Sequence, residues 1–87
     1  LLCLDVLEHS ADPAGVAEQM HAVLKPGAKL LLTTPFNFYI HGTKQVPDLW
    51  RLTEAGLRQV LSMFSDVQIE PTGAAQFPRS YLVAATK

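Results

Sequence analysis

The sequence contains a single cysteine, Cys3, in 87 residues. One cysteine excludes an intramolecular disulfide, and its place in the apolar run LLCL favours a buried thiol over a reactive one. Chains that lack disulfides are typical of reducing compartments. We therefore expect a cytoplasmic protein whose cysteine is structural.

An excess of charge of one sign and long apolar runs are also missing. Seven Lys and Arg stand against eight Asp and Glu, which gives a net charge of −1. A near-neutral chain without a basic stripe lacks the usual means of binding nucleic acid or an anionic membrane. The apolar runs fall short of the roughly 18 residues that a spanning helix needs, and no charged leader with a cleavage site occurs. We therefore expect neither nucleic acid nor a membrane as a partner.

What remains is the composition of a small globular domain. Hydrophobic residues make up 48% of the chain and charged residues 17%, as in ordinary globular proteins. The length leaves little room beyond one domain, so we treat residues 1–87 as one. A chain of this size has a thin core, because only roughly 60–65% of its unfolded surface is buried on folding. The loss of any segment that covers this core would therefore lower the stability of the domain.

Two amphipathic helices are predicted from N-caps and apolar spacing. Asp12 stands before Pro13, an N-cap followed by a residue suited to the first helical position. Apolar residues then recur on one helical face until the Lys-Pro-Gly at positions 25–27. Thr53 can cap a second helix, in which apolar residues recur at i, i+3, i+4 and i+7 between positions 57 and 64.

Four segments are predicted as strands. Two are near-continuous apolar runs, typical of parallel strands covered on both faces, and a third alternates like a half-exposed outer strand. In chain order the four are Leu1 to Val6, Ala28 to Thr34, residues 67–69 with a close at Pro71-Thr72-Gly73, and Tyr81 to Ala85. The order β-α-β-long loop-α-β-loop-β predicts an α/β fold.

Ligand sites in such folds lie at the carboxyl ends of the parallel strands. Two segments are expected at that edge, residues 5–12 and residues 35–52, and they contain His9 and His41. The third histidine, His21, falls on the first helix, where a surface or core-flanking imidazole is expected.

The connection from Phe36 to Thr53 is much longer than the usual four to six residues or so. Loops of this length tend to be functional or disordered. Disorder seldom retains four aromatic residues, here Phe36, Phe38, Tyr39 and Trp50. We therefore interpret the loop as functional, a lid whose aromatics cover an acceptor.

Three stretches, DVLEHSADP, VLKPGAKLLLTTPF and DLWRLTEAGLRQVL, resemble the carboxyl-terminal half of a class I S-adenosyl-L-methionine-dependent methyltransferase of the type 11/23 kind. The resemblance implies the later strands of a Rossmann-like sheet, with the last strand antiparallel and inserted beside the second one of this chain. The glycine-rich first loop of such enzymes has no counterpart, since the five glycines stand singly. The resemblance thus implies a missing amino-terminal half and weak cofactor binding by this piece alone.

Asp5 and Val6 match the segment that passes beside the methionine part of the cofactor in similar methyltransferases, so the resemblance makes them cofactor-binding candidates. In the alternative interpretation, Glu8 and His9 only begin the solvated lead-in to the next helix. The Asp-x-x-Glu-His spacing is also similar to a divalent-ion cluster in some quinone-biosynthesis O-methyltransferases of this fold. Hard ions favour more oxygen ligands than this spacing supplies. We assign no metal and leave an ion near Asp5, Glu8 and His9 open.

The stretch HGTKQVPDLWRLT resembles a pattern found in uncharacterised members of this methyltransferase group. The resemblance suggests catalytic roles for His41 and His9, with His41 a base or positioner, and a substrate-binding role for Asp48, Trp50 and Arg51. In the structural alternative, Trp50 fills the core while Asp48 and Arg51 pair to pin the loop. For Trp50 and Arg51 we favour the structural alternative.

The function predicted is methyl transfer from S-adenosyl-L-methionine to an unidentified small-molecule acceptor, by a fragment inactive alone. The alternative is a non-catalytic, methyltransferase-like binding module. The expected partner is the missing amino-terminal half or, failing that, another copy pairing with the apolar edge strand at Leu1 to Val6.

Overall fold

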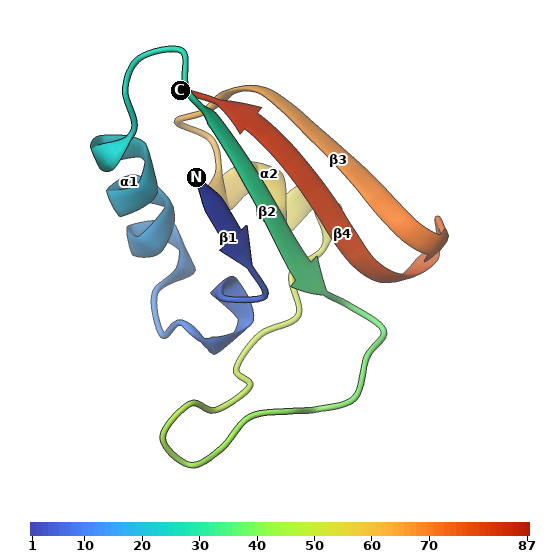
Figure 1. The fold of residues 1–87 in the computed structure, drawn as a ribbon. Coiled ribbons are helices and arrows are strands. Elements are labelled where there is room, and N and C mark those ends of the chain that lie inside the picture. The colour runs from blue at the N-terminus through green and yellow to red at the C-terminus, as the bar shows by residue number, and fades with distance from the viewer.

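A computed structural model describes residues 1–87. The chain forms a four-stranded sheet and two α-helices, whose arrangement can be followed in Figure 1. The elements in chain order are β1 (Leu2–Leu4), a 3-10 helix (Leu7–His9), α1 (Pro13–Val23), β2 (Lys29–Pro35), α2 (Glu54–Val60), β3 (Ser65–Ala74) and β4 (Phe77–Thr86). The segment between β2 and α2 forms neither helix nor strand. Neither helix is long and apolar enough to cross a membrane.

The sheet is mixed, with the strand order β1-β2-β4-β3. β1 and β2 are parallel, with Cys3 opposite Leu32, and the α1 crossover joins them as the sequence predicts. β4 lies antiparallel between β2 and β3. The strand inserted beside β2 agrees with the arrangement that the resemblance implies. β1 forms one edge of the sheet.

Both helices begin at the predicted caps. The Asp12 carboxylate accepts a hydrogen bond from the backbone N–H of Gly15 at 3.0 Å, and the Thr53 hydroxyl accepts one from that of Gly56 at 3.1 Å. Such caps contribute about 1 kcal/mol each. They fix where the helices begin, and so where the preceding loops leave the edge of the sheet.

The two helices pack on one face of the sheet (Figure 1). This face forms the core with them, through Cys3, Leu7, Ala17, Met20, Leu30, Leu32, Leu57, Leu61, Phe64, Tyr81, Val83 and Ala85. Burial raises the pKa of the Cys3 thiol, with a smaller contribution from the charge of Glu8. The prediction of a buried cysteine is confirmed.

The other face of the sheet is exposed, so the prediction that the first two strands are covered on both faces is wrong for this chain. The exposed fractions of its leucines are 65% for Leu2, 56% for Leu4, 50% for Leu31 and 45% for Leu82. The physical reason is that the only two α-helices lie on the opposite face. The apolar residues of the two strands would favour burial on both faces of the sheet, but no segment of this chain covers the second face.

Strand boundaries also differ from prediction in β1, β3 and β4, and the last begins at Phe77 instead of Tyr81. β1 ends at Leu4 because Asp5 adopts a left-handed conformation with a φ of 52°, which ends the extended run before Val6. β3 continues past the predicted close at residues 71–73 to Ala74, with a register shift at Thr72/Gly73. Pairing with β4 carries the strand through that turn signal, because a bulge absorbs the irregular residues.

Candidate functional site

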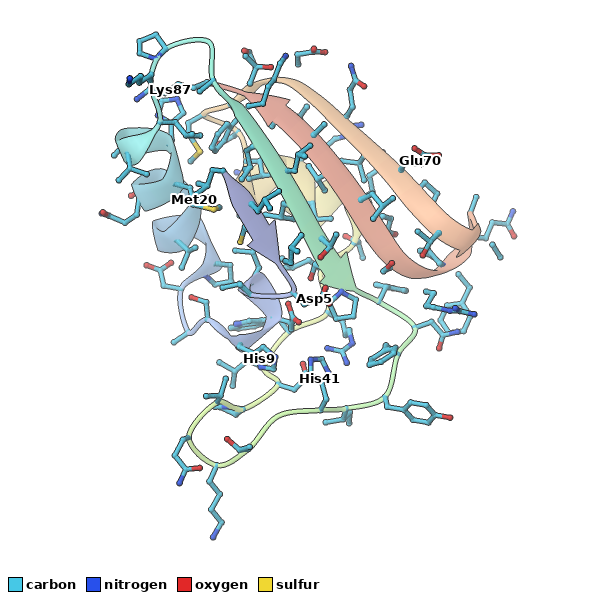
Figure 2. The ribbon with its side chains drawn as sticks, in the orientation of Figure 1. Asp5, His9, Met20, His41, Glu70 and Lys87 are labelled. Atoms are coloured by element: carbon cyan, nitrogen blue, oxygen red, sulfur yellow. The ribbon has the colours of Figure 1, made fainter.

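The candidate site lies where β1 and β2 end, at the carboxyl edge of the sheet (Figure 2). The Asp5 backbone N–H donates to the Thr33 carbonyl at 3.0 Å, and the Thr33 hydroxyl donates to the Asp5 carboxylate at 3.0 Å. Aspartate tolerates the left-handed conformation better than most residues. The turn at Asp5 brings the following 3-10 helix to the same edge as the long loop.

Glu8 is fully buried, with 0% of its side chain exposed. The alternative in which Glu8 belongs to a solvated lead-in is therefore wrong. Its backbone carbonyl accepts hydrogen bonds from Leu49 and Trp50 of the long loop, at 2.7 and 3.1 Å. These hydrogen bonds hold the long loop over the 3-10 helix, and the loop shields Glu8 from solvent.

Two imidazole rings face the buried carboxylate of Glu8. His9 Nε2 lies 3.7 Å and His41 Nε2 3.5 Å from Glu8 Oε2, and the two Nε2 atoms are 3.1 Å apart. Neither carboxylate oxygen of Glu8 has a hydrogen-bond partner within bonding distance. The chain therefore gathers three polar side chains from two segments 32 residues apart in sequence, and Figure 2 shows His9 and His41 side by side.

The outward nitrogens of both rings are held by acceptors. His9 Nδ1 lies 2.7 Å from the Pro47 carbonyl, and His41 Nδ1 lies 3.2 Å from the Tyr39 carbonyl and 3.1 Å from the Asp48 carboxylate. Carbonyls and carboxylates only accept, so we assign the Nδ1 proton to both rings. In the neutral form of each ring, Nε2 then carries a lone pair, within 3.7 Å of Glu8 Oε2.

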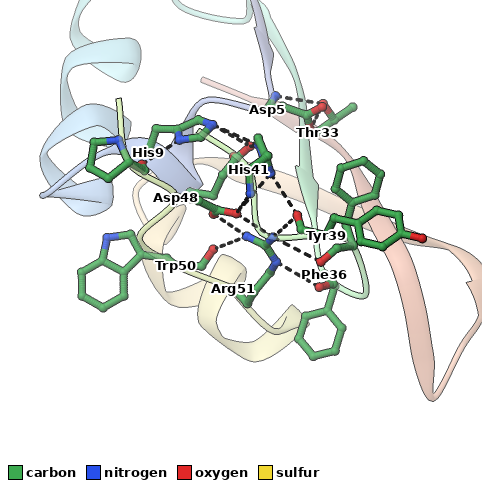
Figure 3. A network of polar contacts seen from close by, with 12 residues as sticks. Asp5, His9, Thr33, Phe36, Tyr39, His41, Asp48, Trp50 and Arg51 are labelled. Carbon is green, nitrogen blue, oxygen red and sulfur yellow. Dashed lines mark hydrogen bonds and ion pairs between the residues drawn. The ribbon is translucent and has the colours of Figure 1, made fainter. Parts of the chain in front are cut away.

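The position of His41 depends on an ion pair behind it (Figure 3). Arg51 donates to both carboxylate oxygens of Asp48, at 2.6 and 2.8 Å, and the second oxygen accepts from the His41 backbone N–H at 2.9 Å. Arg51, chiefly through its hydrogen bonds, holds the pKa of Asp48 at about 2. Arg51 also donates to the Phe36 carbonyl at 3.0 Å. The predicted pairing of Asp48 with Arg51 is confirmed.

Trp50 does not fill the core, contrary to the alternative we favoured, because 45% of it is exposed. Its indole N–H donates to the Ser10 carbonyl at 2.7 Å. The backbone N–H of Trp50 donates to the Glu8 carbonyl. The indole therefore lies along the segment that precedes α1 and not under the sheet. Its role in the fold is to fasten two segments at the edge.

Glycine at position 42 is required by the turn that follows His41. Gly42 has a φ of 121°, and a Cβ there would collide with the Val46 carbonyl oxygen. Thr43 and Val46 close the turn through a backbone hydrogen bond of 2.9 Å. The turn brings Pro47 and Asp48 back beside the two histidines.

A pocket of about 500 Å³ opens beside this cluster. Among the predicted site residues, Asp5, His9 and His41 line it, together with Thr33, Pro35, Phe38, Arg79 and Ser80. Val6 is 44% exposed and does not line it. Asp48, Trp50 and Arg51 border a separate hollow of about 310 Å³. The structure thus divides the predicted residues into two groups.

Sequence reasoning missed three pocket residues, Thr33, Arg79 and Ser80. A signal existed for the last two, since an antiparallel final strand beside β2 has its first residues at the carboxyl end of β2. A larger hollow of about 600 Å³ lies on the exposed sheet face and is mostly apolar. It holds no cluster of titratable groups, so we place the candidate site at the edge of the sheet.

Comparison with protein families identifies the family of this chain. A family model described as a methyltransferase domain matches residues 1–71, which include β1, β2, both helices and the long loop. A search of curated proteins found no match.

Proposed function

The chain belongs to the methyltransferase-domain family, and on that premise we propose that it is the carboxyl-terminal part of an S-adenosylmethionine-dependent methyltransferase acting on a small-molecule acceptor. The observation that carries the proposal is the pocket at the carboxyl edge, lined by Asp5 and Arg79 on one hand and by His9 and His41 on the other. Crevices at this edge are where α/β sheets of this kind bind ligands.

The charges at the pocket fit the amino acid end of the cofactor. That end carries an ammonium and a carboxylate, which complement the carboxylate of Asp5 and the guanidinium of Arg79. Asp5 keeps its carboxylate oriented through the Thr33 hydroxyl. When bound, S-adenosylmethionine supplies an electrophilic methyl group on a sulfonium.

The residues of this chain would then align the acceptor and exclude water. An acceptor that retains a proton at neutral pH needs a group to receive it as the new bond forms. The Nε2 atoms of His9 and His41 are the basic groups at the pocket, and Asp48 holds the Nδ1 proton of His41 on the far side. Phe38 adds an apolar wall.

The bare sheet face supports the part of the proposal that concerns a longer domain. Leu2, Leu4, Leu31 and Leu82 are each at least 45% exposed, an apolar patch of the kind that usually marks an interface. We propose that the preceding part of the methyltransferase domain covers this face. The longer protein would then carry the glycine-rich loop that this chain lacks.

The test is a calorimetric titration of S-adenosylhomocysteine into that longer protein. Asp5→Asn removes the charge yet tolerates the left-handed backbone, and it should weaken binding by roughly 10- to 100-fold, the loss of one charged hydrogen bond. Asp66→Asn is the matched control, because Asp66 is also exposed with a positive φ, 49°. Equal affinity of the two variants would reject Asp5 as a cofactor residue.

The reading frame upstream tests the catalytic proposal as a whole. A glycine-rich strand-to-helix turn followed by an acidic strand end would support the enzyme. A start codon immediately before Leu1 would instead favour a non-catalytic binding module, in which the exposed leucines contact another protein.

A further inference from the structure

We propose that Glu8, His9 and His41 form a binding site for a Zn²⁺-like divalent metal ion. The inference goes beyond methyl transfer, because it depends only on how these three side chains meet. Each offers one ligand atom, and the three atoms lie within 4.8 Å of one another. Asp5 is not among them.

The spacing of the three ligand atoms matches a zinc site. His9 Nε2, His41 Nε2 and Glu8 Oε2 are separated by 3.1, 3.5 and 3.7 Å. A point in their plane and equidistant from all three lies about 2.0 Å from each, the usual length of zinc bonds to nitrogen and carboxylate oxygen. An ion can therefore be accommodated with little movement of the side chains.

The hydrogen-bonding pattern of the cluster calls for a cation. Both rings commit Nδ1–H to acceptors, so both Nε2 atoms carry lone pairs, and they lie 3.5 and 3.7 Å from Glu8 Oε2. Glu8 is fully buried, and neither of its oxygens has a hydrogen-bond partner. An unpaired buried carboxylate is strongly destabilising. Either a metal ion or a proton on one imidazole would relieve that destabilisation.

The contacts behind the ligands favour the metal ion over the proton. Metal-binding histidines almost always donate their second ring N–H to a carboxylate or a backbone carbonyl. His9 donates to the Pro47 carbonyl, and His41 is placed against the Asp48 carboxylate, itself fixed by Arg51. Two nitrogens and one oxygen suit zinc or a similar transition metal better than Mg²⁺ or Ca²⁺, which prefer oxygen.

The site borders the proposed acceptor pocket, because His9 and His41 also line it. Zinc sites with three protein ligands keep a further position for water or substrate. In the metal-bound state the Nε2 lone pairs of His9 and His41 would bind the ion and could not also act as bases, so an oxygen-containing acceptor would instead occupy the open position on the ion. Binding of the acceptor to the ion rests on the proposed function, whereas the metal site itself does not.

The experiment is a titration of chelator-treated protein with Zn²⁺ in competition with a chromophoric chelator, and with Co²⁺ followed by visible absorption. We expect one ion per chain and the absorption of a low-coordinate Co²⁺ site. His41→Ala and Glu8→Gln should each weaken Zn²⁺ binding by roughly 100-fold or more, since even outer partners of metal ligands cost 10- to 100-fold. His41 is 34% exposed in a loop, so its variant is expected to fold even if Glu8→Gln does not.

Two controls separate this site from others. His21→Ala removes the histidine that packs against Phe64, outside the cluster, and should leave binding unchanged. Asp5→Asn should also leave it unchanged. The proposal is overturned if His41→Ala binds Zn²⁺ as the unaltered chain does, or if Asp5→Asn abolishes binding. It is also overturned if no ion binds to the chelator-treated protein.

Discussion

Replacing Asp48 by asparagine should lower the free energy of unfolding by about 2 kcal/mol at pH 7. The side chain is 2% exposed and accepts hydrogen bonds from Nη1 and Nη2 of Arg51 and from the backbone N–H of His41. Its pKa falls from 3.8 to about 2, and one pKa unit corresponds to about 1.4 kcal/mol. Charged hydrogen bonds contribute a similar amount, about 1.5–3 kcal/mol.

The sign of the pH dependence follows from the lowered pKa of Asp48. Because the unfolded chain takes up the proton first, this stabilisation is complete above about pH 4 and is lost as the pH falls toward 2. Urea unfolding of both proteins across this range is the assay. Glu54→Gln is the control, because the Glu54–Arg58 pair is 49% exposed on both sides and contributes little. A difference at pH 7 no larger than the control's, or one that does not shrink between pH 4 and 2, would refute the reasoning.

Three further substitutions test other parts of the structure. Trp50→Ala should cost about 1–2 kcal/mol in urea unfolding, less than the 3–5 kcal/mol of a buried aromatic, because the indole is half-exposed and loses chiefly its bond to Ser10; a cost above 3 kcal/mol would contradict this. His41→Ala in the longer protein should lower turnover by roughly 100-fold or more when the acceptor loses a proton, with the affinity for S-adenosylhomocysteine retained; normal turnover would remove His41 from the reaction. Leu31→Lys should reduce self-association of the 87-residue chain in sedimentation, whereas Leu49→Lys, at a similar exposure in the loop, should not; equal effects would dissociate the sheet face from self-association.

Local signals in the sequence predicted where the helices begin and which segments form strands, but not that α2 ends at Val60, before Leu61 and Phe64 of its predicted apolar face. The helix starts follow from capping hydrogen bonds made by Asp12 and Thr53 to residues three positions further on. The first two strands follow from the two apolar runs. Both signals act within a few residues, so the sequence alone reveals them. The placement of His9 and His41 at one edge followed from the rule for parallel strands. These signals could not predict that the second face of the sheet is exposed. An apolar run indicates that a strand tends to be buried, but it does not show which segment covers it.

The details of the site depend on contacts that no local pattern contains. Glu8 becomes buried because the backbone of Leu49 and Trp50 bonds to its carbonyl across the edge. The alternative that we favoured placed Trp50 in the core, yet its indole N–H donates to the Ser10 carbonyl and 45% of the residue is exposed. A residue spacing indicates which groups can meet, whereas the tertiary hydrogen bonds decide which ones do.

Hydrogen exchange of the longer protein, with and without S-adenosylhomocysteine, tests the central claim most directly. The account predicts slower exchange in peptides that cover residues 4–9 and 35–41, because they surround the pocket at the carboxyl edge. Peptides of the β3–β4 turn, residues 73–77, should be unaffected. Binding that leaves residues 4–9 and 35–41 unprotected would contradict the assignment of this edge as the site of methyl transfer.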